Sequence, residues 1–246
     1  MKHGKRRVRW GRVLALLLAA VGIWAACRLL LPGLTSGKIA VALDPGHGGS
    51  DPGASGIIAE TELTEQTVRA LAGMLEEDGR FRVILCREYG EGKDLNRRWL
   101  RSILSGADLL LSVHGNSADD PTARGFEAYP ALPDSSYHED SLRFARLLAG
   151  EMGEAGAALR GDGGIRYAYY DEAGNKLLRD APDPELEGLP SFAMVQYPRC
   201  PAVLAEQCFV TNAEDVADFA GEEGCARAAA CYYRAICAYF ELEPKT

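Results

Sequence analysis

Short apolar runs alternate with longer amphipathic segments along most of the chain. The runs with the length and composition of buried strands are residues 38–43, 81–86, 108–113, 125–129 and 201–206. The segments with apolar residues at helical spacing are residues 64–77, 94–104, 141–152 and 222–240. Strands separated by helices predict a single α/β domain with a mostly parallel central sheet flanked by helices. Open sheets of this kind place their functional sites at the carboxyl ends of the strands.

The first 38 residues differ from the rest of the chain. Residues 1–12 are rich in Lys and Arg, residues 13–34 are apolar except for Arg28, and residues 35–38 form a short linker. A bilayer span needs about 20 mostly apolar residues, and positive charge before it keeps the N-terminus in the cytoplasm. The pattern therefore predicts one N-terminal transmembrane helix over 13–34, preceded by a basic cytoplasmic tail and followed by an extracytoplasmic body.

Two other interpretations of residues 13–34 remain open. A cleaved signal peptide has the same basic and apolar regions, and it would release the body as a secreted protein. Trp24-Ala-Ala-Cys27 weakly resembles a lipoprotein cleavage site. All three interpretations export the body, and the basic tail could in addition bind anionic lipid.

The charge of the body argues against nucleic acid as a partner. The whole chain has 27 basic and 35 acidic residues, and eight of the basic ones but none of the acidic ones lie in residues 1–38. Residues 39–246 therefore carry 19 basic and 35 acidic residues, a net charge of −16. A body this acidic repels a phosphate backbone.

The cysteines favour buried free thiols over a disulfide framework or a zinc ribbon. Six of the seven cysteines lie in the body, and no two of them form a Cys-x-x-Cys pair. Cys200 and Cys208 could pair only if the chain doubles back between them. Buried cysteines commonly act as small apolar residues.

Two histidines stand at the ends of separate predicted strands. The first predicted strand ends in Asp44-Pro-Gly-His47-Gly-Gly, and the third ends in Ser112-Val-His114-Gly-Asn116. Neutral imidazole is a good zinc ligand, and a catalytic zinc site uses three protein ligands with water in the fourth position. A carboxylate could complete the set, and both Glu60 and Glu62 are candidates at the start of the first helix.

From about Lys38 to Phe240 the chain resembles the zinc-dependent N-acetylmuramoyl-L-alanine amidases of the type-3 class, which cut bacterial peptidoglycan. Four motifs carry the resemblance in the correct order, and their specificity lies in that order. They are Asp44-Pro-Gly-His47-Gly-Gly with Asp51-Pro-Gly, then Glu60, then Ser112-Val-His114-Gly-Asn116, then Pro201-Ala-Val-Leu-Ala-Glu206 followed by Phe209 and Thr211-Asn212. Asn96-Arg97-Arg98 is also similar to an arginine-bearing helix of the family.

The resemblance implies a role for each of four residues. His47, Glu60 and His114 correspond to the family's zinc ligands, and Glu206 corresponds to its catalytic acid/base. Glu60 is preferred to Glu62 because an apolar residue and a small polar residue follow Glu60 at the third and fourth positions, as in the family.

The resemblance also implies the substrate, peptidoglycan or its muropeptide fragments, and the bond, the amide between the lactyl group of N-acetylmuramic acid and L-Ala. Zinc would lower the pKa of a bound water from 15.7 to about 7, and Glu206 would move the proton to the leaving amine. Residues 39–246 would form the catalytic domain, with 156–190 as an inserted loop of unassigned function. No protein partner is indicated.

Other functions are possible on the same fold. Ser112 or Ser50 could act as a nucleophile, although no Gly-x-Ser-x-Gly elbow is present, and Cys208 is the only thiol near a motif. A catalytically inactive module that binds the cell wall or regulates another enzyme is the non-enzymatic alternative. Such a module would be expected to lack a ligand or the base, and none of the four residues is missing.

Overall fold

The computed structural model describes residues 37–245, and residues 39–246 form one compact unit. The basic tail, the apolar segment 13–34 and Cys27 lie outside the described residues, so the transmembrane helix stays a prediction. Within the described part of the chain, no helix combines the length and the apolar character that crossing a bilayer requires.

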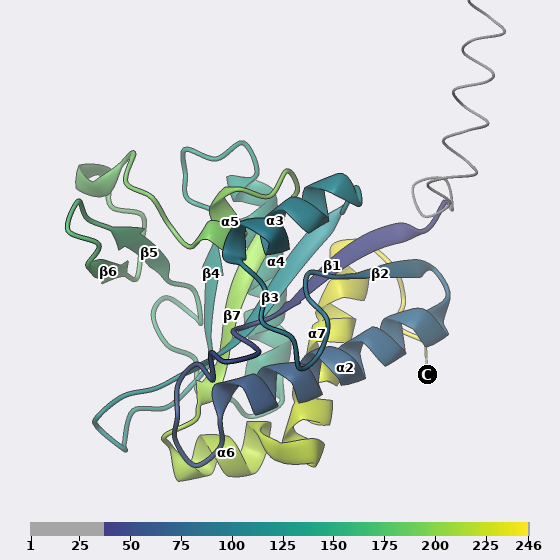
Figure 1. The fold of residues 1–246 in the computed structure, drawn as a ribbon, viewed down its shortest axis with the longest axis horizontal. Helices are drawn as coiled ribbons and strands as arrows, with labels where there is room; N and C mark the ends of the chain where they lie inside the picture. The colour runs from purple at the N-terminus through teal and green to yellow at the C-terminus, as the bar shows by residue number, and fades with distance from the viewer. Residues whose placement is uncertain (1–36, 246) are drawn as a thin grey trace, which may run out of the picture. The chain divides into compact units, whose positions relative to one another are not determined.

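A five-stranded sheet forms the centre of this unit (Figure 1). Its order is β2 (Phe81–Leu85), β1 (Ile39–Pro45), β3 (Leu109–Asn116), β7 (Ala202–Phe209) and β4 (Glu127–Pro130). The first four strands are parallel, and β4 pairs antiparallel with β7 at one edge. The expected mostly parallel sheet is confirmed, and the carboxyl ends of β1, β3 and β7 meet at the same edge.

Helices cover both faces of the sheet. One face packs against α2 (Glu60–Asp78), α4 (His138–Glu154) and α7 (Gly221–Tyr239), while α3 (Leu95–Leu104) and the short α5 (Ala193–Gln196) lie on the other (Figure 1). The short helix α6 (Ala213–Phe219) connects β7 to α7.

Each strand contributes side chains to two hydrophobic cores, one on each face of the sheet, because successive side chains point to opposite faces. In β1, Val41 and Leu43 belong to the larger core with α2, α4 and α7, whereas Ala40 and Ala42 belong to the smaller one. This two-sided burial explains why β1 is apolar at nearly every position.

The segment 156–190 is more ordered than the expected inserted loop. It contains an antiparallel hairpin, β5 (Tyr167–Tyr170) and β6 (Lys176–Arg179), and the 3-10 turn η2 (Pro184–Leu186). Its first part runs beside β4, where the Ala128 amide donates to the Gly164 carbonyl at 2.7 Å. The sequence did not predict this hairpin, because each strand has only four residues. An alternation of apolar and polar residues over four positions does not stand out in a segment rich in Gly, Asp and Pro.

The prediction of free, buried cysteines is confirmed for the body. All six of its cysteines are free and buried: Cys86, Cys200, Cys208, Cys225, Cys231 and Cys237. Burial raises the pKa of each thiol.

Candidate active site

Three separate segments bring polar side chains to the carboxyl edge of the sheet. His47 follows β1 in a turn and has a left-handed backbone, with φ of 57°. Glu60 is the first residue of α2, and His114 lies near the end of β3. The turn after β1 thus places one histidine opposite the other, with the helix start beneath both.

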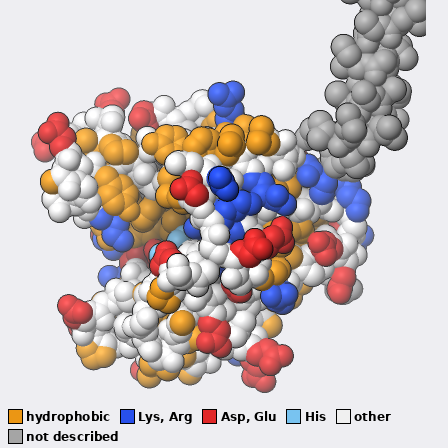
Figure 2. All heavy atoms as spheres, viewed as in Figure 1, with side chains coloured by type: hydrophobic (Ala, Val, Ile, Leu, Met, Phe, Trp, Pro, Cys, Tyr) orange, Lys and Arg blue, Asp and Glu red, His pale blue; other side chains and the backbone are white. Residues whose placement is uncertain are grey.

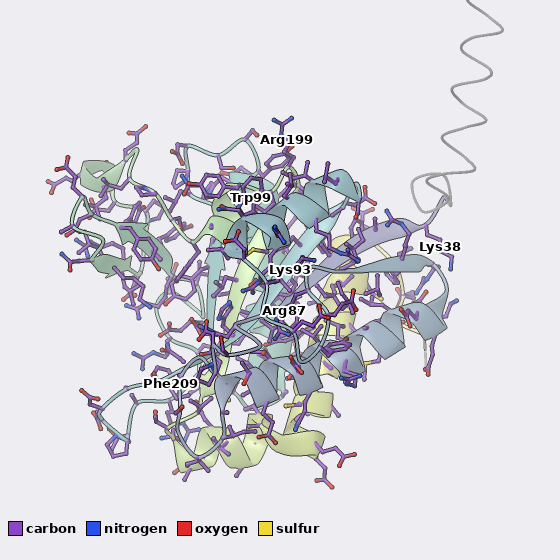
Figure 3. All side chains as sticks on the ribbon, viewed as in Figure 1. Lys38, Arg87, Lys93, Trp99, Arg199 and Phe209 are labelled. Carbon is purple, nitrogen blue, oxygen red and sulfur yellow. The ribbon has the colours of Figure 1, made fainter. Side chains whose placement is uncertain are left out.

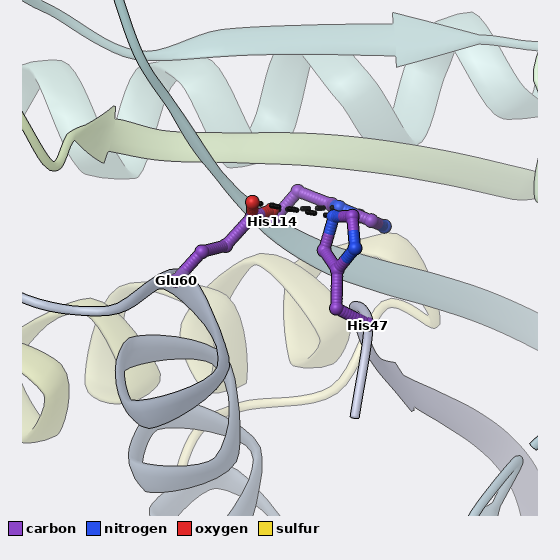
Figure 4. A group of neighbouring side chains, drawn as sticks. All are labelled: His47, Glu60 and His114. Carbon is purple, nitrogen blue, oxygen red and sulfur yellow. Dashed lines mark hydrogen bonds and ion pairs between the residues drawn. The ribbon is translucent and has the colours of Figure 1, made fainter. Parts of the chain in front are cut away.

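The three side chains form a compact cluster (Figure 4). One ligand atom from each of His47, Glu60 and His114 lies within 4.8 Å of the other two. Glu60 Oε1 is 2.9 Å from His114 Nδ1, and Glu60 Oε2 is 3.2 Å from His47 Nε2. Glu60 also accepts hydrogen bonds from the amides of Ala54 and Gly115, at 2.7 and 3.0 Å.

Two glycines make room for this cluster because they have no side chain. A Cβ added at Gly46 would lie 2.6 Å from the His114 ring, and one added at Gly53 would lie 2.4 Å from Glu60 Oε2. Gly53 also has φ of 65°, a left-handed conformation that glycine adopts without strain. Glycine is therefore required in these turns for steric reasons.

Polar groups outside the three-residue cluster hold it in place. Asp51 Oδ2 lies 2.8 Å from His47 Nδ1, which leaves His47 Nε2 to face Glu60. Below the turn, Arg98 donates two hydrogen bonds to the fully buried Asp44, at 2.7 and 2.6 Å, and Ser112 donates a third at 2.6 Å. Carboxylates that orient metal-binding histidines in this way are common outside the ligand set itself.

The charges in the cluster stabilise one another. Burial by itself would raise the pKa of Glu60, but the hydrogen bonds from His114 and His47 lower it well below its usual range. The hydrogen bond to Glu60 raises the pKa of His47 to about 9, against the opposing effect of burial. Without a metal ion, Glu60 is thus an anion that both imidazoles surround.

Glu206 stands next to this cluster on β7, where it pairs in register with His114 on β3. Its Oε2 atom is shielded from solvent and has no hydrogen-bond partner among the described residues. Burial raises the pKa of Glu206 to about 7; the charge of Glu60 adds to this rise, whereas His114 and Lys176 oppose it. A carboxyl group with such a pKa exchanges protons readily near neutral pH.

Glu127 was not singled out from the sequence, yet it lies on β4 directly opposite Glu206. It is fully buried and accepts hydrogen bonds from Arg160 Nε at 2.5 Å, from Arg166 Nη1 at 3.2 Å and from the Tyr129 hydroxyl. The only sequence signal is an acidic residue in an otherwise apolar strand. Its place beside Glu206 follows from the antiparallel pairing of β4, which the sequence pattern did not indicate.

The cluster lies in a cleft of about 510 Å³ that His47, Glu60, His114 and Glu206 all line. In Figure 2, hydrophobic side chains border one side of the hollowed region, where a histidine is visible in pale blue, and charged side chains lie on the other sides. Phe192, Met194 and Leu204 contribute apolar surface to the lining, while Lys93 and Lys176 contribute positive charge.

The alternative nucleophiles are poorly placed. Ser112 is fully buried and donates to Asp44, and Cys208 is buried with its thiol pKa raised well above the usual value. Ser50 is exposed, and within residues 37–245 it makes no hydrogen bond to a histidine. Among the described residues, none of the three is hydrogen-bonded to a histidine that could activate it as a nucleophile.

The residues present fit a metal ion. Two imidazoles and one carboxylate form a ligand set found in catalytic zinc sites. Glu60 is only 3% exposed, so its charge is directed at the histidines, and the unpartnered Glu206 oxygen borders the same space. Glu62 points elsewhere, because it is exposed and accepts a hydrogen bond from Gln66 at 3.1 Å.

An α/β domain with this cluster at the carboxyl edge of its sheet has the architecture expected of a metal-assisted hydrolase. Comparison with known families is more specific, since the family model described as N-acetylmuramoyl-L-alanine amidase matches residues 41–238. The chain belongs to the N-acetylmuramoyl-L-alanine amidase family.

Individual relatives agree with this assignment. The chain is 28% identical over 177 residues to the N-acetylmuramoyl-L-alanine amidase LytC of Bacillus subtilis, a match that covers 71% of this chain and 30% of LytC. It is 37% identical over 115 residues to the amidase CwlM of Bacillus licheniformis, covering 43% of this chain and 44% of CwlM. The chain therefore spans less than half the length of these relatives.

Solved structures show the same fold. The catalytic domain of the amidase CwlV from Bacillus (Paenibacillus) polymyxa var. colistinus superposes with a TM-score of 0.67 at 24% identity, covering 83% of this chain and 99% of that one. An N-acetylmuramoyl-L-alanine amidase from Clostridium difficile 630 gives a TM-score of 0.68 at 21% identity, covering 83% and 98%.

Proposed function

We propose that this chain is a zinc-dependent peptidoglycan hydrolase. It cleaves the amide between the lactyl group of N-acetylmuramic acid and the L-Ala of the stem peptide. The observation that carries the proposal is the convergence of His47, Glu60 and His114 beside the unpartnered carboxylate of Glu206, in a chain of the amidase family.

His47, Glu60 and His114 would hold the zinc ion, each from a different segment of the chain. Bound there, zinc would acidify a water molecule and polarise the scissile carbonyl. Asp51 orients the His47 ring, and the amides of Ala54 and Gly115 fix the Glu60 carboxylate. These contacts hold the ligands in place before substrate arrives.

Glu206 would act as the proton carrier. As a carboxylate it accepts a proton from the attacking water, and as a carboxylic acid it donates that proton to the departing amine nitrogen of L-Ala. A pKa near 7 suits both halves of this cycle, because neither protonation state is strongly disfavoured.

The N-terminal segment would place the enzyme on the outer side of the membrane, close to its substrate. The support is the apolar segment 13–34 with basic residues before it. We propose an uncleaved anchor, and cleavage would instead release the same catalytic unit as a secreted enzyme.

The first test is hydrolysis of a defined muropeptide by the purified chain. Chelation should abolish the release of stem peptide, and added zinc should restore it. Glu206→Gln should slow turnover by about 100-fold or more while the bound zinc is unchanged, because general acid–base catalysis contributes about 10²–10⁴-fold. Full activity in Glu206→Gln would refute its role as acid/base.

The same experiment separates the enzyme from an inactive wall-binding module. A chain that binds zinc and peptidoglycan but releases no stem peptide under any condition would be such a module. A chain that cleaves peptidoglycan but is insensitive to chelation would retain the amidase assignment and lose the zinc mechanism.

A further inference from the structure

Two lysines line the cleft and have no part in the chemistry described above. Lys93 is half-buried, Lys176 is exposed, and neither forms an ion pair with a carboxylate in the part of the chain that the structure describes. Lys176 Nζ lies 5.6 Å from the centre of the Phe192 ring, which is itself part of the cleft lining.

The two lysines come from segments near opposite edges of the sheet. Lys93 belongs to the loop between β2 and α3 (Figure 3), and this loop packs closely on the turn that carries His47. A Cβ added at Gly49 would lie 2.4 Å from the Gly92 amide nitrogen, so the two loops touch at backbone level. Lys176 begins β6 in the hairpin of segment 156–190, which extends beside β4 at the other edge.

Most other charged groups of the cleft already have partners. Asp51 is paired with His47, Glu60 with both histidines, and Arg98 with the buried Asp44. Glu206 lies beyond ion-pair distance of Lys176, although the lysine's charge is close enough to act on it. The cleft therefore presents two positive groups that are available to an anionic ligand.

The setting of Lys176 favours a carboxylate ligand. Its ammonium nitrogen lies over the Phe192 ring, and this cation–π contact limits the positions of the ammonium group at the cleft wall. The ring of Phe192 is held in turn by Tyr129 and Tyr170, with ring centres 5.3 and 5.8 Å away. The ammonium group is therefore held over a supported platform at the cleft wall.

We propose that Lys176, aided by Lys93 on the opposite wall, forms a subsite that binds a free carboxylate of the stem peptide beyond L-Ala. The inserted hairpin is then a substrate wall that selects acidic over amidated stem peptides. This inference rests on the proposed amidase function and adds to it a preference for substrates whose stem peptide has a free carboxylate. Amidation removes a negative charge and leaves the peptide's size nearly unchanged, so the preference depends on charge.

The test compares two substrates, N-acetylmuramoyl-L-Ala-D-Glu and the same compound with both carboxylates of its D-Glu converted to amides, so that no free carboxylate remains beyond L-Ala. We expect the wild-type chain to favour the acid by about fivefold in kcat/KM, the effect of one partly exposed charged hydrogen bond. Lys176→Gln should remove this preference, mainly through a higher KM for the acid, and Lys176→Arg should keep most of it. Lys93→Gln should reduce it, and added salt should weaken it in the wild type.

The matched control is Arg227→Gln, which removes a surface charge from α7 far along the chain from the cleft segments. The control should leave the preference unchanged. Bound zinc, measured in every variant, shows that the metal site is intact. Equal cleavage of acid and amide by the wild type, or an undiminished preference in Lys176→Gln, would overturn the subsite and leave the amidase function standing.

A binding measurement separates failure of the subsite from failure of the proposed function. Calorimetry with Glu206→Gln and with the double variant Glu206→Gln/Lys176→Gln compares the Kd of acid and amide without turnover. If the wild type cleaves neither compound, the proposed function fails and the Kd values still decide the subsite. Tighter binding of the acid that disappears with Lys176 supports it, and equal binding refutes it.

Discussion

Glu60 and Glu62 lie two positions apart in the first turn of α2 and have very different surroundings. Residues two apart point to different sides of a helix, because each residue advances the helix by about 100°. Glu60 is buried against both histidines, whereas Glu62 is exposed and meets only Gln66. The choice of Glu60 made from the sequence therefore agrees with the geometry, and its role as a ligand is open to experiment.

Glu60 and Glu62 allow a controlled test of zinc binding, because the same substitution can be made at both positions. Glu60→Gln should lower zinc affinity by about 10-fold or more, because a neutral amide replaces the buried carboxylate of a proposed ligand and alters the imidazoles that it contacts. Glu62→Gln should bind zinc like the wild type. Competition with a fluorescent chelator measures both affinities. Equal zinc affinity in the two variants would exclude Glu60 as a ligand.

The site was predictable where single residues carried the signal. His47, His114 and Glu206 each follow or end an apolar run, and parallel strands bring such positions to one edge. Glu127 was missed because its position depends on which strand β4 pairs with and in which direction. No local pattern in Gly125–Tyr129 contains that information.

At the scale of elements, the helices were predictable in their centres and less so at their ends. The apolar spacing predicted a helix from residue 64, and α2 begins at Glu60 because its polar first turn faces the site. Helix α6 was missed, although Asn212 caps it by accepting hydrogen bonds from the amides of Glu214 and Asp215. Asn followed by acidic residues is a known helix start, but seven residues are too few to show a period.

The C-terminal end of α2 forms hydrogen bonds that connect it to α7 and to the last described residues of the chain. Asp78 is buried and receives hydrogen bonds from Arg80 and from the Tyr233 hydroxyl of α7, the latter at 2.6 Å. Lys245 donates its amide to the same hydroxyl at 2.9 Å. The Arg80 hydrogen bonds lower the pKa of Asp78 well below its usual range, against the opposing effect of burial.

This cluster predicts a contribution to acid stability. An unfolded aspartate has a pKa of about 3.9, so the contribution of Asp78 is complete above that value and is lost as pH falls below it. Asp78→Asn should lower the free energy of unfolding by about 2 kcal/mol at pH 7, since it weakens hydrogen bonds to a charged group. Urea unfolding at pH 7 and pH 3 should show a smaller difference at pH 3.

The control for this prediction is Asp218→Asn. Asp218 is half-exposed and lies 3.9 Å from Arg227 in a surface ion pair, which contributes little to stability. Its free energy of unfolding should match that of the wild type at both pH values. A destabilisation of Asp78→Asn that is the same at pH 3 and pH 7 would show that the aspartate's charge is not the cause.

At the scale of the whole molecule, the body relies on packing and contains no disulfide among its described residues. Burial raises the pKa of the Cys200 thiol to about 12, and it raises the pKa of the other five as well. Thiolates are the reactive species, so these cysteines should react only when the protein opens.

Thiol labelling tests this expectation. In a Cys27→Ser variant, a chromogenic disulfide reagent at neutral pH should modify the native protein no faster than it unfolds. In about 6 M guanidinium chloride, well above the unfolding midpoint of most domains, all six thiols should react at once. Rapid modification of any thiol in the native protein would show that the site is exposed.

The overall architecture could be predicted from the sequence because strand and helix patterns alternate. The structure of the inserted segment 156–190 could not be predicted in this way. Apolar runs such as Leu109–Val113 can be buried only in a sheet with both faces covered, so their sequence restricts the fold. The hairpin β5–β6 is held by contacts with β4 and by its turn from Asp171 to Asn175, where Asp171 accepts two hydrogen bonds from Asn175. Its position depends on those partners more than on its own residues.

The last strand to be made, β7, lies between β3 and β4, which precede it by many residues. During synthesis, His47, Glu60 and His114 emerge with the first half of the chain, long before the segment that bears Glu206. Strands β2, β1 and β3 pair with one another directly, whereas β4 joins this sheet only through β7. A nascent chain of this design would lack Glu206, the proposed proton carrier, until its synthesis is nearly complete.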